Sequence, residues 1–370
     1  MQALSTHPMK IWAYQQALKL ATNIQAIPAK VTPAPFRLLQ ISSAFWHSRA
    51  LYVATRLQIA DALADQTLSI QALAEHLQLD ADHLYRLLRL LAALGVFEEV
   101  RPKTFANSAS SHYLRSDHPQ SIRAMILLHN SPEMSAPWFE ALEDCIRSGG
   151  IPFQHTHGKD LFAYMDSHPE FDHLFSQAMS SVEHLTGTDF LQDFNWGAFT
   201  RLIDVGGSTG HKTLSILQAH PKLQALVFDR PQVVAQAHWA GQFPAAVLER
   251  ISFQGGDFFS SLPLAQSEQD LYVFSAIFHT LSDTQGKQVL TNLKTACGAY
   301  KPWVLIADAV VAEAKADSTL AAFDMQMLMG TQGRERSLSE WQSLLQDSGF
   351  SLVKVLDVRT FAKFLVLRKD

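Results

Sequence analysis

Short apolar runs alternate with helical stretches in the last half of the sequence, and this alternation constrains the fold most strongly. The runs include RLIDV, ALVFD, DLYVFSAIF and PWVLIADAVV. Runs that are apolar throughout are typical of parallel strands buried on both faces. The series predicts a Rossmann-like α/β domain with a mostly parallel sheet over residues 196–370. The last two runs, FSLVKVLDV and FAKFLVLRK, have a connector too short for a helix, so we expect an antiparallel pair.

Helical patterns dominate the sequence ahead of this domain. In residues 36–121, two helices flank a turn at Asp80, and a short hairpin follows Gly95, which is a winged-helix pattern. This block carries more leucine and aromatic side chains than it could bury alone, so we expect a homodimer. Residues 1–35 are expected to form a helical arm and a linker, the linker being the proline-containing stretch Ala29 to Phe36.

Composition disfavours several classes of partner. The net charge is −5, and the second helix of the winged-helix pattern offers only Arg86 and Arg89 as cations, so nucleic-acid binding is disfavoured. Cys145 and Cys297 stand far apart, which fits a reducing cytoplasm and neither a disulfide framework nor a metal cluster. We expect no membrane segment, because no apolar run approaches the ~20 residues of a membrane span.

The stretch DVGGSTG, Asp204 to Gly210, is open to three interpretations. A phosphate-binding P-loop fails because His211 separates Gly210 from Lys212. The letters match the nucleophile elbow of a serine hydrolase, with Ser208 as nucleophile, but such an elbow usually follows several strands. A glycine-rich turn from strand to helix, placing backbone N–H groups under a nucleotide-like cofactor, accounts for more of the surrounding residues.

Acidic residues end three successive predicted strands. Asp204 precedes Gly206, Asp229 ends the second strand, where it could accept hydrogen bonds from ribose, and Asp257 ends the third, within reach of an adenine amino group. A carboxylate before the turn would repel the pyrophosphate of a dinucleotide but attract an ammonium. S-adenosylmethionine (SAM) carries an ammonium and a sulfonium and no phosphate, so we predict SAM as the cofactor.

His279 is the candidate general base. It follows the end of a buried strand, the edge where ligands bind in such sheets. Asp308, after the next strand, and Glu335, in the loop GRERS, could face it, orient the imidazole and raise its pKa. Alternatively, Asp308 caps the following segment and Glu335 pairs with Arg334 or Arg336.

Taken in order, these motifs resemble the SAM-dependent O-methyltransferase family, which includes plant caffeic acid and isoflavone O-methyltransferases, acetylserotonin O-methyltransferase and bacterial natural-product enzymes. The likeness covers residues 36–370 and rests on LIDVGGSTG, LVFDRPQVV, GGDFF, IFHTLSD and GRERSLSEW. It implies a class I methyltransferase domain at 196–370, a dimerisation domain at 36–121, and a helical connector and substrate lid at 122–195.

The resemblance also implies roles for individual residues. His279 would be the catalytic base, flanked by Asp308 and Glu335. The positions expected at the cofactor are Asp204, Gly206, Asp229, Asp257, Phe258 and Ser275, the last where plant enzymes carry a lysine. Those expected along the substrate pocket are Met179, Trp138 and Met327. No metal is expected.

Three departures from the family pattern bear on the chemistry. Thr280 and Leu281 stand where the family has Asp and Trp, which leaves open a SAM-binding member that catalyses decarboxylation, hydroxylation or rearrangement. Ser208 replaces a glycine, which we expect to be tolerated at negative φ. The favoured function is methyl transfer to a hydroxyl of a small aromatic metabolite, and the least favoured is a SAM-responsive winged-helix regulator.

Overall fold

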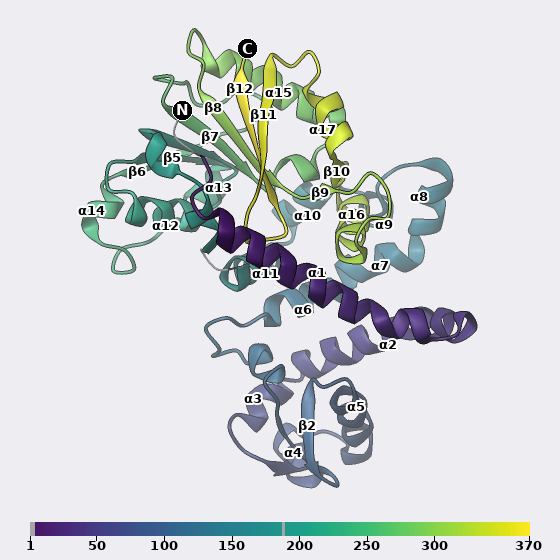
Figure 1. Cartoon of the computed structure of the whole chain (residues 1–370). Coiled ribbons are helices and arrows are strands. Elements are labelled where there is room, and N and C mark those ends of the chain that lie inside the picture. Colours follow the sequence, from purple (N-terminus) through teal and green to yellow (C-terminus); the bar gives the residue numbers. More distant parts are fainter. Residues whose placement is uncertain (1–3, 187–188) are drawn as a thin grey trace. The chain divides into compact units, whose positions relative to one another are not determined.

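The computed structural model describes residues 4–186 and 189–370, which belong to two compact units (Figure 1). One unit, here the sheet unit, comprises Met1–Lys19 and Thr188–Asp370, and the other, the helical unit, comprises Leu20–Gly187. Within the described residues, no helix has both the length and the apolar character needed to cross a membrane.

The sheet unit is built on a seven-stranded sheet in the order β11-β12-β8-β7-β4-β5-β6. Its strands are β4 (Arg201–Val205), β5 (Gln224–Asp229), β6 (Ile251–Gly255), β7 (Asp270–Ser275), β8 (Trp303–Asp308), β11 (Phe350–Asp357) and β12 (Lys363–Lys369). The strands β4 to β8 pair in parallel, whereas β12 is antiparallel to both β8 and β11. The predicted mostly parallel sheet with an antiparallel C-terminal pair is confirmed.

Helices cover both faces of this sheet (Figure 1). They are α12 (His211–Ala219), α13 (Pro231–Val234), α14 (Ala245–Leu248), α15 (Asp283–Cys297), α16 (Ser318–Gly330) and α17 (Leu338–Leu345), with 3-10 turns η2 (Asp189–Asp193), η3 (Trp196–Ala198) and η4 (Phe278–Thr280). In β4, Ile203 and Val205 pack in one core cluster with α15 and α17, while Leu202 packs in another with α12 and α14. Burial on both faces is why these strands are apolar throughout.

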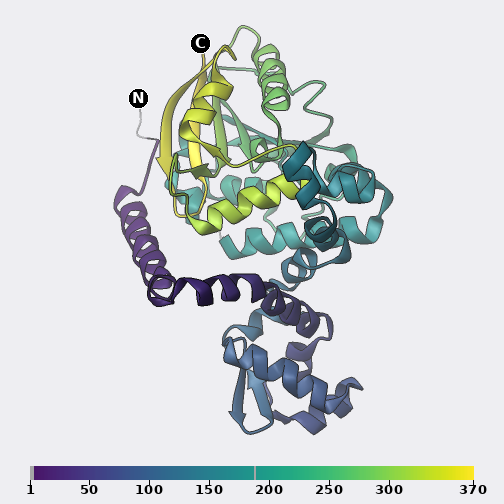
Figure 2. The same cartoon turned by 90° about the vertical axis from the view of Figure 1, so that its right-hand side faces the viewer.

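The predicted winged-helix pattern lies in the helical unit, after the end of the N-terminal helix α1 (Pro8–Val31). It contains α2 (Ala34–Arg56), α3 (Ile59–Leu63), β1 (Leu68–Ser69), α4 (Ile70–Leu77), α5 (Ala81–Ala93), β2 (Phe97–Arg101) and β3 (Thr104–Asn107). Asp80 starts α5 as its N-cap, accepting a hydrogen bond from the backbone N–H of His83. The β2–β3 hairpin is antiparallel, and Figure 2 shows it among the blue helices.

The rest of the helical unit is helical, as expected. The elements are η1 (Ser111–Leu114), α6 (Arg123–His129), α7 (Pro132–Glu140), α8 (Leu142–Ser148), α9 (Pro152–His157), α10 (Leu161–Ser167) and α11 (Pro169–Thr186). A core of apolar side chains, including Leu128, Phe153 and Phe171, joins α6, α9 and α11.

The prediction of a linker from Ala29 to Phe36 is wrong. The N-terminal helix α1 (Pro8–Val31) continues past Ala29, and α2 already begins at Ala34, so only Thr32 and Pro33 separate the two helices. Pro33 is the N-cap of α2, and a second proline follows in its first turn. A proline is tolerated there because the first N–H groups of a helix have no partner within it. These prolines start a helix instead of marking a linker.

Candidate active site

Three carboxylates lie at one edge of the sheet. β4, β5 and β6 are parallel neighbours, so Asp204 near the end of β4, Asp229 at the end of β5 and Asp257 just after β6 share the carboxyl-terminal edge. The Asp204 carboxylate is buried and accepts a hydrogen bond from the Thr213 hydroxyl at 2.5 Å. Ligands bind at this edge of open parallel sheets.

The other two carboxylates organise the loops that follow them. Asp229 accepts hydrogen bonds from the backbone N–H groups of Ser208 and Arg230, at 2.8 and 2.7 Å. Asp257 accepts from the Phe259 N–H at 2.8 Å and the Ser260 hydroxyl at 3.0 Å. Because the Ser208 N–H belongs to the turn after β4, this hydrogen bond connects the end of β5, where Asp229 lies, to the end of β4.

The glycines of the turn after β4 are required by close packing. Gly206 has φ +75°, and a Cβ there would lie 2.3 Å from the Ile277 Cδ1. A Cβ on Gly207 would lie 2.4 Å from the Asp204 Oδ2. Side chains at these positions would therefore push aside the loop after β7 or the buried carboxylate.

The condition of negative φ, under which serine in place of glycine was expected to be tolerated, is not met at Ser208. Ser208 has φ +55°, in the left-handed region that favours glycine. The chain changes direction sharply at this residue, because it leads from the end of β4 to Gly210, the N-cap of α12. In this conformation the Ser208 N–H donates a hydrogen bond to Asp229. A serine hydrolase would need a hydrogen bond between the Ser208 hydroxyl and its catalytic histidine, and the described residues show none between Ser208 and His279.

His279 stands on a sharp turn after β7. Ala276, directly after the strand, has φ +56°, and its N–H donates to the Ala307 carbonyl at the end of β8. The chain then forms the short turn η4, which holds His279 with 18% of its side chain exposed. The His279 Nδ1 lies 2.8 Å from the Glu335 Oε1.

A two-residue parallel pairing brings Glu335 to this place. The short strands β9 (Val310–Val311) and β10 (Arg336–Ser337) pair with Arg336 opposite Val310. Asp308 lies two residues before Val310, and Glu335 lies one residue before Arg336, so the pairing fixes both acids near η4. The structure thus brings together His279, Asp308 and Glu335.

The alternative roles considered for these acids do not match the geometry. Glu335 bonds His279, whereas Arg334 pairs with Asp283 and Glu340. Asp308 is 2% exposed, and neither of its carboxylate oxygens has a hydrogen-bond partner among the described residues, so it caps no segment there.

Burial and charge shift the pKa values of this cluster. Burial raises the pKa of Asp308 to about 7, so this carboxyl is only partly ionised at neutral pH. Burial alone would lower the pKa of His279, but the hydrogen bond to Glu335 and the charges of Asp308 and Glu335 outweigh it. The pKa of His279 therefore lies above its ordinary value of 6.5. The neutral imidazole is thereby a stronger base.

Two residues that the sequence interpretation missed hold the His279 turn. The Arg336 side chain is fully buried, and its guanidinium donates to the carbonyls of Phe278 and Leu281, both at 2.7 Å, and to Asp283. A Cβ on Gly333 would lie 2.0 Å from the His279 carbonyl oxygen. Both belong to the stretch GRERS, in which the sequence indicates Arg336 only as a possible partner of Glu335.

The two departures after His279 fit the local packing. The Thr280 hydroxyl donates to the Ile277 carbonyl at 2.8 Å, within the same turn. Leu281 is 4% exposed and belongs to the core cluster that contains α15 and α17. Both side chains support the turn that carries His279.

The remaining expected residues are spread over both units. Phe258 is half-buried after β6, and Ser275 is the last residue of β7, so both lie near the carboxyl-terminal edge of the sheet. Met327 is half-buried in α16. Trp138 in α7 and Met179 in α11 are 36% and 41% exposed and belong to the helical unit, so their place along the substrate pocket stays a prediction.

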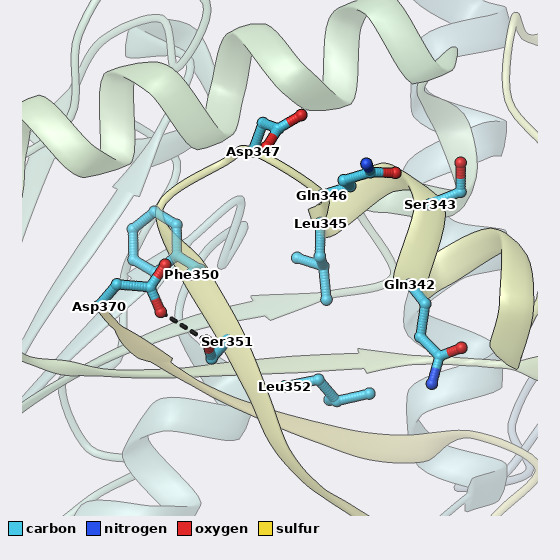
Figure 3. A pocket seen from close by; sticks show the side chains of 9 residues that line it. All are labelled: Gln342, Ser343, Leu345, Gln346, Asp347, Phe350, Ser351, Leu352 and Asp370. Carbon is cyan, nitrogen blue, oxygen red and sulfur yellow. Dashed lines mark hydrogen bonds between the residues drawn. The ribbon is translucent and has the colours of Figure 1, made fainter.

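A surface hollow of about 580 Å³ lies elsewhere in the sheet unit. Figure 3 shows it between α17 and the start of β11, lined by side chains that include Gln342, Phe350 and Asp370. Phe350 pairs with Lys369, and β12 runs antiparallel to β8. The hollow is therefore at the amino-terminal end of the parallel strands, opposite the edge that carries His279.

The fold and the carboxyl-terminal edge of the sheet define a class I SAM-dependent methyltransferase, and solved neighbours with this fold contain SAM. The chain belongs to the O-methyltransferase family. Residues 139–351 match the family's O-methyltransferase domain, and residues 39–117 match its dimerisation domain. It is a SAM-dependent O-methyltransferase.

Several known proteins are similar to this chain over most of its length. Phenazine O-methyltransferase PhzM of Lysobacter antibioticus is 31% identical, over 89% of this chain and 94% of its own. The 8-amino-8-demethylriboflavin N,N-dimethyltransferase of Streptomyces davaonensis is 31% identical, over 82% and 87%. The structure of human N-acetylserotonin methyltransferase with SAM has a TM-score of 0.79 and 26% identity, over 92% and 99%.

Replacing Gly333 by alanine tests the close packing behind His279. We expect Gly333→Ala to displace the His279 turn, lower kcat by at least about tenfold and cost about 1–3 kcal/mol of unfolding free energy, as overpacking does. Methyl-transfer kinetics and urea unfolding measure the two effects. Gly197→Ala is the matched control, because its added Cβ would meet only ordinary contacts at 3.6 Å. Native kinetics in Gly333→Ala would contradict this account.

Proposed function

We propose that this protein transfers the methyl group of SAM to a hydroxyl of a small aromatic metabolite, with His279 as general base. The observation that carries the proposal is the hydrogen bond between His279 and Glu335 at the carboxyl-terminal edge of the sheet. A histidine held by a carboxylate at the ligand-binding edge is suited to take a proton from an acceptor hydroxyl.

The residues at this edge fit SAM. Asp229 and Asp257 offer carboxylates at the ends of β5 and β6, which suit ribose hydroxyls and an adenine amino group. Gly206 lets the turn after β4 pack against Ile277 in the loop after β7, at the same edge of the sheet. Asp204 supplies negative charge suited to an ammonium, with Phe258 and Ser275 as further candidates at the same edge. SAM, when bound, supplies an electrophilic methyl group on a sulfonium.

The hydrogen bond to Glu335 decides which imidazole nitrogen acts. A carboxylate oxygen can only accept, so the Nδ1 of His279 carries the proton and donates it. Nε2 is left as the basic atom, and it would take the proton of an acceptor hydroxyl. Glu335, with Asp308 behind it, stabilises the imidazolium that results.

The acceptor is proposed to lie against apolar and aromatic side chains. Met327, Trp138 and Met179 are the candidates predicted from the sequence for contact with the acceptor, and methionine adapts well to flat ligands. The names of two relatives specify a phenazine and a riboflavin derivative, both planar aromatic compounds. An aromatic hydroxyl is also acidic enough for a histidine base of raised pKa.

Substitution of His279 tests the assigned reaction. We expect His279→Ala to lower kcat/KM at least about 100-fold, because general-base catalysis contributes about 10²–10⁴-fold. Affinity for S-adenosylhomocysteine, measured by calorimetry, should stay within about twofold, since the imidazole bonds Glu335 and not the cofactor turn. Activity is measured as S-adenosylhomocysteine and methylated product with a panel of phenolic acceptors.

The control for this experiment is His238→Ala, which removes an exposed histidine of the sheet unit. Full activity in His279→Ala would refute its role as base. Turnover of an acceptor without stoichiometric S-adenosylhomocysteine would instead support decarboxylation, hydroxylation or rearrangement.

Substitution of Glu335 tests the pKa of the base. His279 acts when neutral, so kcat/KM should rise with pH through its raised pKa, above 6.5. Glu335→Gln removes the charge that raises this pKa, so the rising limb should move to lower pH by about one unit or more. The plateau should fall about tenfold because the imidazole is less basic. Glu268→Gln, a substitution of an exposed glutamate, is the control. If the rising limb of the Glu335→Gln profile moved to higher pH, the assignment of His279 as a base supported by Glu335 would be refuted.

We also propose that the protein is a homodimer and resides in a reducing cytoplasm. The dimerisation-domain match covers most of α2, on which Leu38, Phe45 and Trp46 are more than half exposed. A monomer rarely exposes so large an apolar surface. Cys145 and Cys297 are free and buried, which supports the reducing compartment.

Introducing charges on α2 tests the dimer. We expect light scattering to give twice the 41.2 kDa chain mass for the native protein, and the chain mass for the Leu38→Glu/Phe45→Glu variant. Buried unpaired carboxylates at an interface oppose association. Gln71→Glu, on the exposed face of α4, should remain dimeric. A native protein at the mass of one chain would refute the proposal.

A further inference from the structure

Trp239 makes an unusual contact with the turn that precedes α12. Its indole Nε1–H donates a hydrogen bond of 2.6 Å to the backbone carbonyl of Thr209. Thr209 lies in the turn of residues 206–210, which links β4 to α12 and is here called the cofactor turn. An indole nitrogen can only donate, so this side chain has one specific partner in the segment.

The cofactor turn holds Ser208 in a backbone conformation that is unfavourable for serine. Ser208 has φ +55°, and the left-handed region is unfavourable for residues with a Cβ. Without external contacts, a turn with serine here would favour other backbone angles. Two hydrogen bonds oppose that change, one from the Ser208 N–H to Asp229 and one from Trp239 to the next residue's carbonyl.

Ring packing fixes the Trp239 side chain. Its ring centroid lies 5.5 Å from that of His211, the first residue of α12, and 5.7 Å from that of Phe243. Trp239 and Phe243 are half-buried and pack against the core cluster that includes α12 and α14. The Trp239 carbonyl also accepts a hydrogen bond from the Gln242 N–H, which closes a tight turn between α13 and α14. The donor is therefore held in place before any ligand binds.

We propose that Trp239 is a positioning residue that holds the cofactor turn in its SAM-binding conformation. It compensates for serine at a position whose backbone angles suit glycine. The effect passes through the Thr209 carbonyl, so Trp239 need not touch the cofactor or the acceptor. The proposal rests on the SAM requirement of the family and is independent of the acceptor and of the role of His279.

Trp239→Phe removes the N–H donor and keeps an aromatic ring. We expect the dissociation constant for S-adenosylhomocysteine, measured by calorimetry, to rise about threefold to tenfold, the range set by one neutral hydrogen bond. The KM for SAM should rise in parallel, while kcat at saturating SAM stays within about twofold. Trp303→Phe, the same change at the amino-terminal end of β8, should leave both unchanged.

A second background separates this role from general stabilisation. Ser208→Gly accepts the left-handed conformation without a Cβ penalty. In Ser208→Gly protein, Trp239→Phe should therefore weaken S-adenosylhomocysteine binding by less than half the factor seen with Ser208. Equal factors in both backgrounds, or a fall in kcat and melting temperature at unchanged affinity, would overturn the proposal.

Discussion

The two-residue parallel pairing of β9 with β10 is the contact on which the candidate active site depends. It joins the segment after β8 to the segment before α17, which are far apart in sequence. Arg336 lies in this pairing, and its buried guanidinium reaches the carbonyls of the His279 turn and Asp283. The short strand β10 therefore has two effects. It fixes the position of Glu335, which directly precedes it, and through Arg336 it holds the turn that carries His279. A buried arginine is stable here because carbonyls and a carboxylate satisfy its donors.

The two acids of this site are both buried, but they differ in their hydrogen-bond partners. Asp308 lies at the end of a central strand, where its oxygens have no hydrogen-bond partner within the described part of the chain, and burial raises its pKa to about 7. Glu335 is also buried, but it bonds His279 directly and supports the protonated imidazole. Glu335 is therefore the hydrogen-bond partner of His279, whereas the charge of Asp308 depends on pH near neutrality. A site with two bare carboxylates beside the imidazole would incur a larger desolvation penalty.

The sheet could be predicted because strands buried on both faces leave a strong signal in sequence. The runs containing Asp204, Asp229 and Asp308 are apolar up to their acidic residues, and each acid lies at the carboxyl-terminal edge in the structure. Local conformation was harder to predict. Pro33 suggested a linker but starts α2, and Ser208 has positive φ because of a contact from a neighbouring strand. Thr280 and Leu281, departures from the family pattern, proved to support the turn beside His279.

The sequence by itself determined the order of strands and helices, the residues that could carry chemistry and the family. These follow from apolar periodicity and short motifs, which are local properties of a chain. Only the tertiary structure decided which partner each polar group takes: Glu335 bonds His279 and not an arginine, Arg336 holds a turn, and Trp239 bonds the cofactor turn. Such choices depend on distances between segments remote in sequence and on the cost of burying unpaired polar groups, and neither is encoded in local pattern.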